Sequence, residues 1–230
     1  MLNRLDTIVS LVDTCDTVAD IGTDHGFVPV KLIAEGRCDR VIATDLNRGP
    51  YEIASKFVEE KGLLNQIEVR LGNGLDPVNL KEVDTIIVAG MGGLLIKKII
   101  EDGLKDISYH HTLILQPMNA SDKLRKFLFN KNFRIVEESL SKEDTHFYEI
   151  IKAIKTEERV NVEDDVFYEI GRPLIEKKHP LIRLFLKNKI RICQGIINEM
   201  IIGGKPKESV KSLEDKILSY RRLMEKHDIE

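Results

Sequence analysis

The sequence lacks the features of several large protein classes. Its 230 residues contain three cysteines, and no two of these have the C-x-x-C spacing of a zinc or redox site. No apolar run approaches the roughly 18 residues that a membrane-spanning helix requires. The six histidines form neither an H-E-x-x-H motif nor an H-x-x-x-H pair. We therefore expect no membrane span, no disulfide framework and no metal site.

The N-terminal segment also lacks the continuous apolar block of a signal peptide. Its apolar residues recur at helical spacing among charged ones: Leu2, Leu5, Ile8, Val9 and Val12. Together with cysteines that we expect to stay reduced, this predicts a cytoplasmic protein.

The net charge of −3 is distributed unevenly along the chain. Residues 172–230 hold 14 Lys and Arg against 8 Asp and Glu, whereas residues 1–171 hold 21 against 30. A basic C-terminal segment on an acidic body indicates either an anionic partner or a solvated, lysine-rich helical face.

Short apolar runs alternate with amphipathic segments up to about residue 155. We expect strands at 17–22, 40–46, 67–72, 84–90 and 112–117, helices at 29–36, 50–62, 93–103 and 121–131, and two closely linked strands at 133–140 and 146–154. Nearly continuous apolar strands separated by helices predict an α/β fold with a Rossmann-like, mostly parallel sheet and an antiparallel end. Ligands of such sheets bind at the carboxyl ends of the strands.

From residue 172 the pattern is helical. Two apolar stripes, at 172–202 and 207–227, flank a turn at 203–206 and predict an antiparallel hairpin with packing close to that of a coiled coil. The first helix is expected to kink or to start afresh at Pro180. We thus predict a Rossmann-like domain over residues 1–158 and a helical coiled-coil domain over residues 159–230.

The first strand runs into a glycine turn that contains charged side chains, Gly22-Thr23-Asp24-His25-Gly26. A dinucleotide-binding loop has glycine where Asp24 stands, so that the backbone can approach a pyrophosphate. A carboxylate would repel that group but suits a cationic ligand. S-adenosylmethionine has no phosphate and carries a sulfonium and an ammonium, so the turn favours it over NAD. The alternative is a strand–turn–helix corner that binds no ligand.

The ends of the other strands supply further candidate contacts. An acid such as Asp45 at the end of the second strand commonly accepts hydrogen bonds from ribose hydroxyls. The predicted cofactor contacts are Gly22, Asp24, His25, Asp45, Leu46, Asn73, Gly74, Gly90 and Met91. Predicted substrate contacts near the cleft are Gly92, Gly93, Gln116, Pro117, His146 and Tyr148.

These motifs together resemble a known family. ADIGTDHGFVP (19–29), ATDLNRGP (43–50), RLGNGL (70–75), VAGMGG (88–93), LILQPM (113–118) and HFYEII (146–151) are similar to the bacterial tRNA (adenine(22)-N1)-methyltransferases. The resemblance covers essentially the whole chain. It implies a class I S-adenosylmethionine-dependent fold, a C-terminal helical coiled coil, and methyl transfer to N1 of an adenine in the D-arm region of tRNA. The residues alone indicate methyl transfer without identifying the base.

The resemblance also gives the basic segment a role. Phosphate contacts position a nucleic acid without specifying its bases. The residues expected to make them are Arg125, Lys126, Lys177, Lys178, Arg183 and Lys187. The N1 lone pair of adenine needs no strong base, so positioning is expected to dominate catalysis. Asp24 and His25 are the candidate catalytic residues, as acceptors for any proton that leaves the product.

Other functions remain open at this point. The same fold would suit a methyltransferase for a protein or a small molecule. A non-catalytic RNA-binding protein with a vestigial cofactor pocket would also suit the basic hairpin. Asp24 argues against an NAD-dependent oxidoreductase. The sequence leaves the oligomeric state undetermined, with a monomer favoured.

Overall fold

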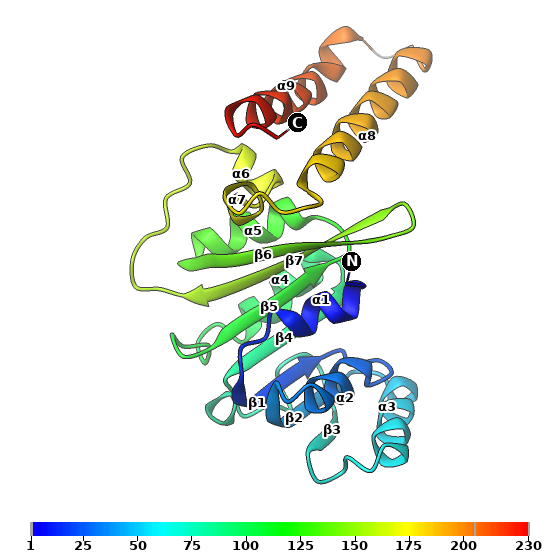
Figure 1. Cartoon of the computed structure of the whole chain (residues 1–230), viewed down its shortest axis with the longest axis vertical. Coiled ribbons are helices and arrows are strands. Elements are labelled where there is room, and N and C mark those ends of the chain that lie inside the picture. Colours follow the sequence, from blue (N-terminus) through cyan, green and yellow to red (C-terminus); the bar gives the residue numbers. More distant parts are fainter. Residues whose placement is uncertain (1, 205, 230) are drawn as a thin grey trace. The chain divides into compact units, whose positions relative to one another are not determined.

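The chain forms two compact units, residues 1–161 and 162–230, in a computed structural model that describes residues 2–204 and 206–229 (Figure 1). The predicted domain boundary, between residues 158 and 159, lies three residues earlier in the same connecting segment. Residue 205, in the predicted turn at 203–206, lies outside the described residues.

A seven-stranded sheet forms the centre of the first unit, with the strand order β3-β2-β1-β4-β5-β7-β6. The parallel strands are β1 (Cys15–Ile21), β2 (Cys38–Asp45), β3 (Ile67–Leu71), β4 (Thr85–Met91) and β5 (Thr112–Pro117). The other two, β6 (Phe133–Glu143) and β7 (His146–Lys155), form a hairpin whose second strand pairs antiparallel with β5. The prediction of a mostly parallel sheet with an antiparallel end is confirmed.

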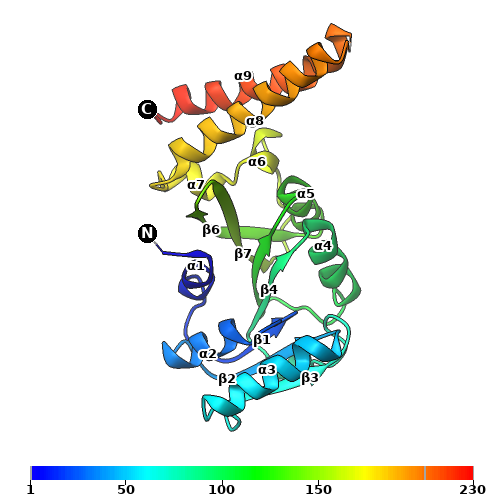
Figure 2. The ribbon, with the colours of Figure 1, turned by 90° about the vertical axis from the view of Figure 1, so that its right-hand side faces the viewer.

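Helices cover both faces of this sheet. The helices α1 (Arg4–Ser10), α2 (Phe27–Ala34) and α3 (Arg48–Glu60) pack on one face, and α4 (Gly93–Asp102) and α5 (Ser121–Asn130) pack on the other (Figure 2). A 3₁₀ turn, η1 (Leu80–Glu82), precedes β4. Successive residues of β4 alternate between the two cores: Ile86 packs with α4 and α5, and Ile87 packs with α1 and α2. Burial on both faces explains why the strands are nearly continuous apolar runs.

The order of the strands places a crevice near β1. From β1 the chain builds outward through β2 to β3, and then returns so that β4 pairs with the opposite edge of β1. The loops after β1 and β4 therefore lead away in opposite directions. Open α/β sheets bind their ligands at such a switch point.

The second unit contains α6 (Val166–Glu169), α7 (Arg172–Glu176), α8 (Ile182–Ile202), η2 (Lys207–Val210) and α9 (Lys211–Lys226). The predicted helix at 172–202 is interrupted before α8, next to Pro180, which has no N–H to donate. Leu186 and Cys193 of α8 and Tyr220 of α9 are buried, as the predicted stripes require.

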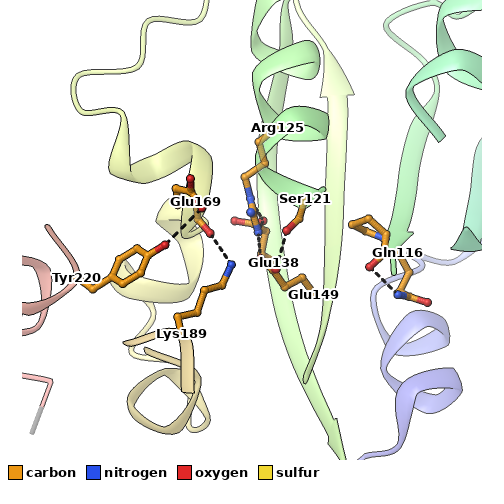
Figure 3. Close-up of polar contacts among 9 residues, drawn as sticks. Gln116, Ser121, Arg125, Glu138, Glu149, Glu169, Lys189 and Tyr220 are labelled. Atoms are coloured by element: carbon orange, nitrogen blue, oxygen red, sulfur yellow. Dashed lines mark hydrogen bonds and ion pairs between the residues drawn. The ribbon is translucent and has the colours of Figure 1, made fainter. Parts of the chain in front are cut away.

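The short helix α6, which the sequence pattern did not reveal, joins α8 to α9 through Glu169 (Figure 3). The Tyr220 hydroxyl donates to Glu169 Oε2 at 3.4 Å, and Lys189 Nζ donates to the Glu169 carbonyl at 3.4 Å. Lys216 forms an ion pair with the same carboxylate. Across the described ranges of the chain, every helix is too short or too polar to cross a lipid bilayer.

Candidate active site

A cavity of about 770 Å³ opens at the carboxyl ends of β1, β2, β3 and β4. The structure brings all nine residues predicted to contact the cofactor to its lining: Gly22, Asp24, His25, Asp45, Leu46, Asn73, Gly74, Gly90 and Met91. These residues come from the last residues of β2 and β4 and from the turns after β1, β2 and β3. They meet because the parallel strands end at the same edge of the sheet.

The glycine turn after β1 has an unusual backbone. Gly22 and Gly26 have φ of 74°, and Asp24 has φ of 54°, a region in which a residue with a side chain costs about 1–2 kcal/mol. A Cβ on Gly22 would lie 2.0 Å from the Met91 methyl carbon, so glycine is required there for space as well as for φ. The strained turn directs the Asp24 side chain, 67% exposed, into the cavity.

Asp45 holds this turn in place from the neighbouring strand. Its Oδ2 accepts the Asp24 backbone N–H at 3.2 Å, and its Oδ1 accepts the Asn47 N–H at 2.9 Å. The carboxylate is buried and lines the cavity. Each carboxylate oxygen accepts more than one hydrogen bond, so both retain capacity for the hydroxyls of a ribose.

Asp20 is a cavity residue that the sequence reasoning missed. It is 3% exposed and lies within β1, directly before Ile21 and the glycine turn. Burial raises the pKa of its carboxyl to about 6, an effect that the Thr23 side chain opposes and the Asp45 carboxylate reinforces. The sequence did contain a signal for Asp20, since it is an acid within a mostly apolar predicted strand. A carboxylate buried in this way needs a polar or charged partner, which indicates a functional site.

The opposite side of the cavity is built by segments distant in sequence. Arg4 and Leu5 of α1, Met118 after β5, Glu143 of β6 and Tyr148 of β7 line it. The Arg4 guanidinium donates from Nη1 to Gln116 Oε1 at 2.9 Å and lies 5.6 Å from the Tyr148 ring centroid. Arg4 and Glu143 had no motif to identify them, since only the fold brings residue 4 beside residue 143.

His25 has aromatic neighbours at the cavity. Its ring stacks on Phe27 with centroids 5.4 Å apart, and Phe27 meets Phe57 edge-on at 5.3 Å. His25 Nε2 lies 3.6 Å from Asp24 Oδ2. The aromatic contacts orient the imidazole beside the candidate acid, and both side chains are accessible from the cavity.

The structure corrects the predicted roles of Gln116 and Pro117, which are buried outside the cavity lining. Gln116 Oε1 accepts the Gly90 N–H at 3.1 Å as well as Arg4, and its amide group donates to the Pro117 carbonyl at 3.0 Å. Gln116 therefore holds the end of β4, and its amide group is already hydrogen-bonded within the protein.

Gly92 and Gly93, which were predicted to contact the substrate, have a structural role in the protein. The Gly93 N–H donates to the Asn119 carbonyl at 3.0 Å, and a Cβ on Gly93 would lie 2.6 Å from that oxygen. A Cβ on Gly92 would lie 3.3 Å from the Asn119 side-chain oxygen. These glycines let α4 start close to the loop after β5, and they lie outside the cavity lining.

The prediction that Arg125 contacts tRNA phosphates is wrong. Arg125 is 0% exposed. It donates to Glu138 Oε1 at 2.8 Å and to Glu149 Oε2 at 2.5 Å, and the Ser121 hydroxyl donates to Glu149 at 2.7 Å (Figure 3). Arg125 lies on the buried face of α5, which packs against the β6–β7 hairpin. Its positive charge therefore stabilises two buried carboxylates of that hairpin. Burial raises the pKa of Glu138 to about 7, and the Arg125 cation opposes that rise.

The remaining predicted substrate residues have different surroundings. Tyr148 lines the cavity, whereas His146 is exposed at the start of β7 and lies outside it. Lys126 is exposed on α5. The other basic residues are exposed in the second unit, where their phosphate contacts stay predictions: Lys177, Lys178, Arg183 and Lys187.

Comparison with known proteins assigns this arrangement to a family. The model of the TrmK family, tRNA (adenine(22)-N(1))-methyltransferase, matches residues 18–222. The Bacillus subtilis tRNA (adenine(22)-N(1))-methyltransferase is 34% identical over 150 residues, which are 65% of this chain and 63% of the relative. The matched sequence thus spans somewhat less than two thirds of that relative's length.

Solved structures extend the similarity over the whole chain. A Streptococcus pneumoniae protein, provisionally described as a tRNA (m1A22) methyltransferase and solved with S-adenosyl-L-methionine, has a TM-score of 0.85 at 31% identity, over 97% of this chain and 100% of its own. TrmK of M. capricolum, solved with S-adenosyl-homocysteine, has a TM-score of 0.80 at 27% identity, over 98% of each chain. The chain belongs to the tRNA (adenine(22)-N(1))-methyltransferase family.

Proposed function

We propose that this protein transfers the methyl group of S-adenosylmethionine to N1 of the adenine at position 22 of tRNA. Membership of the family supports the reaction. The observation that carries the cofactor assignment is the charge of the cavity. Its lining contains the carboxylates Asp20, Asp24, Asp45 and Glu143, and Arg4 is the one Lys or Arg among the described lining residues. An anionic cavity disfavours a pyrophosphate and suits a ligand with a sulfonium and an ammonium.

The residues present fit this cofactor. When bound, S-adenosylmethionine supplies an electrophilic methyl group on sulfur. Asp20 and Asp24 would face the cationic groups, and the oxygens of Asp45 would accept the ribose hydroxyls. Asn73 and Gly74, after β3, would contact the adenine edge. Met91, packed against Gly22, would close the site near the methyl group.

Catalysis in this site depends mainly on positioning. The N1 lone pair of adenine is available at neutral pH, so a strong base is not required to create the nucleophile. Holding the base in line with the methyl group lowers the barrier through preorganisation. Asp24 and His25 are the proposed acceptors for any proton that the product loses, because both are accessible from the cavity.

The second unit is the proposed tRNA-binding element. Its exposed cations, Lys177, Lys178, Arg183 and Lys187, would contact phosphates and position the tRNA without reading its sequence. The target base would be extruded from the folded tRNA to reach the cavity. We further propose that the protein acts in the cytoplasm and as a monomer.

The reaction is tested with labelled S-adenosylmethionine and unmodified tRNA, followed by nucleoside analysis. We expect N1-methyladenosine from a tRNA with adenine at position 22 and none from the same tRNA with guanine there. Lack of N1-methyladenosine, when calorimetry shows that S-adenosylhomocysteine binds, would contradict the proposal. Methyl incorporation that resists ribonuclease would instead identify a protein or small-molecule acceptor.

A further inference from the structure

The carboxylates of the cavity fall into two groups by origin. Asp20, Asp24 and Asp45 come from the ends of β1 and β2, where the cofactor is proposed to bind. Glu143 comes from the last residue of β6, on the hairpin that also supplies Tyr148. It is the one cavity carboxylate, among the described residues, on the side away from those two strands.

One oxygen of Glu143 is fixed and the other is available. Oε1 accepts the backbone N–H of Arg4 at 2.8 Å, which ties the hairpin to the start of α1. Within the described residues, Oε2 has no hydrogen-bond partner, and the side chain is half-buried in the cavity wall. A carboxylate held in this way is preorganised to accept one more hydrogen bond from a ligand.

The positive charge of Arg4 is directed elsewhere. Its guanidinium donates to Gln116 at 2.9 Å and lies over the Tyr148 ring, and the described residues show no ion pair between it and Glu143. Gln116 is fully buried, so this contact has a rigid base. Arg4 thus positions Tyr148 at the wall and leaves the Glu143 charge uncompensated.

The reaction moves positive charge from the cofactor to the target base. The bond between adenine N1 and the methyl carbon forms as the bond between sulfur and that carbon breaks, and the electron pair of the broken bond stays on sulfur. The formal positive charge therefore passes from sulfur to the purine ring, and no proton need leave. An anion beside the ring binds the transition state more tightly than the neutral base, which is the condition for catalysis.

We propose that Glu143 is the carboxylate that faces the target base, where its Oε2 accepts a hydrogen from the adenine N6 amine and stabilises the cation formed by methylation, with Tyr148 stacking on the ring. The proposal rests on the proposed function and deepens it by naming a catalytic and specificity-determining residue. Guanine carries O6 where adenine carries the amine, so the same carboxylate repels it.

The first test compares Glu143→Gln with wild type in steady-state methylation of tRNA. The amide oxygen still accepts the Arg4 N–H, so the wall stays intact while the charge is lost. We expect kcat to fall about 100-fold, as when one preorganised group is removed from an active site, with the Kd of S-adenosylhomocysteine unchanged. Glu143→Asp keeps the charge and should recover part of kcat. A Glu143→Gln enzyme with wild-type kcat, or a Glu143→Asp enzyme no better than it, would overturn the proposal.

Asp144→Asn is the matched control. Asp144 adjoins Glu143 on the same hairpin, is exposed and lies outside the cavity lining. Its φ of 50° is tolerated by asparagine, so the variant removes one hairpin charge without new strain. We expect wild-type kcat. A fall equal to that of Glu143→Gln would assign the effect to the charge of the hairpin and overturn the proposal.

The second test asks whether Glu143 contacts the N6 amine. A tRNA with a purine ribonucleoside in place of the target adenosine keeps N1 but lacks that amine. Without the amine N1 is a weaker nucleophile, so this substrate should slow both enzymes. We expect it to slow Glu143→Gln by a smaller factor than wild type, because the contact between Glu143 and the amine can be lost only once. Independent, multiplicative losses would overturn the assignment. If wild type methylates no tRNA at all, the proposed function itself fails, which is a separate result.

Discussion

At the scale of single residues, the sign of the charge in the cavity is the informative property. Asp24 adopts a left-handed conformation in which its backbone N–H is held by Asp45. A strained residue at a ligand site is maintained by the surrounding structure and indicates function. Asp20 adds a second carboxylate, which is buried in β1 just before the glycine turn. Together they give the end of β1 the negative charge on which the proposed cofactor site depends.

Asp24→Asn and Asp45→Asn are expected to weaken binding of S-adenosylhomocysteine about 10-fold each, which corresponds to about 1.4 kcal/mol. Asparagine tolerates the left-handed φ of residue 24, so the fold is expected to persist. Calorimetry measures the Kd, and the melting temperature reports on folding. Unchanged affinity in both variants would show that the cofactor site lies elsewhere.

The pKa of Asp20 predicts a pH dependence. In the free protein burial raises this pKa to about 6, and the ammonium of the bound ligand is expected to favour the ionised form. Binding at pH 5 must therefore release a proton, and we expect the Kd of S-adenosylhomocysteine to be about 10-fold higher at pH 5 than at pH 7. Asp20→Asn should remove this dependence. A pH dependence that survives the substitution would belong to another group.

The same shift affects stability. Because the pKa of Asp20 in the folded protein lies above its value in the unfolded chain, ionising it costs stability. The contribution of Asp20 to the free energy of unfolding is full below about pH 4 and is lost as the pH rises through about 6. Chemical denaturation of the free protein gives its free energy of unfolding at pH 5 and at pH 7. Between these two pH values, this free energy should fall less for Asp20→Asn than for wild type.

At the scale of elements, the β6–β7 hairpin has two functions. Toward the cavity it supplies Glu143 and Tyr148. Away from it, Glu138 and Glu149 hold α5 through Arg125. Breaking a buried ion-pair network of this kind costs stability, because removing the cation leaves two buried carboxylates without a partner.

Arg125→Met is expected to lower the free energy of unfolding by about 3–5 kcal/mol. Without the cation the pKa of Glu138, already raised to about 7 by burial, should rise further. A buried acid with a raised pKa destabilises the folded protein as the pH increases, because it must then ionise. The difference in free energy of unfolding between wild type and Arg125→Met should therefore be larger at pH 8 than at pH 5. Arg134→Met is the control, because it removes the same positive charge from an exposed side chain on β6. Equal effects from the two substitutions would contradict the structural role of Arg125.

At the scale of the whole molecule, the anionic cavity and the basic segment 172–230 belong to different units. The first unit contains the anionic cavity, and the second contains the exposed cations Lys177, Lys178, Arg183 and Lys187. We expect a tRNA to be attracted by the exposed cations of the second unit and repelled by the carboxylates of the first. We therefore infer that binding of tRNA and binding of the cofactor can be altered separately.

Replacing Lys177, Lys178 and Arg183 together by alanine should raise the Kd for tRNA and flatten its salt dependence. Losing three phosphate contacts should reduce the slope of log K against log salt by about 2–3. Replacing Arg48, Lys56 and Lys61, which belong to α3 and the residue after it, removes as many charges outside the proposed interface. An equal change of slope in both triple variants would contradict an interface on the second unit.

The sequence by itself determined the alternation of strands and helices, the glycine turn with Asp24, and the position of Asp45, because these depend on local patterns and on the ends of strands. It also determined the nine cofactor candidates, since parallel strands must end at one edge of the sheet.

Only the tertiary structure decided which face each remaining side chain presents. Arg125 has the chemistry of a phosphate ligand, but its helix turns it toward two buried carboxylates. Gln116 lies near the carboxyl end of β5, where ligand residues are expected, but its side-chain oxygen already accepts hydrogen bonds from Gly90 and Arg4. Glu143 has no motif, and the fold brings it to the cavity beside residue 4. Contacts between residues more than 100 positions apart leave no local pattern, because only packing of the whole sheet with α1 creates them.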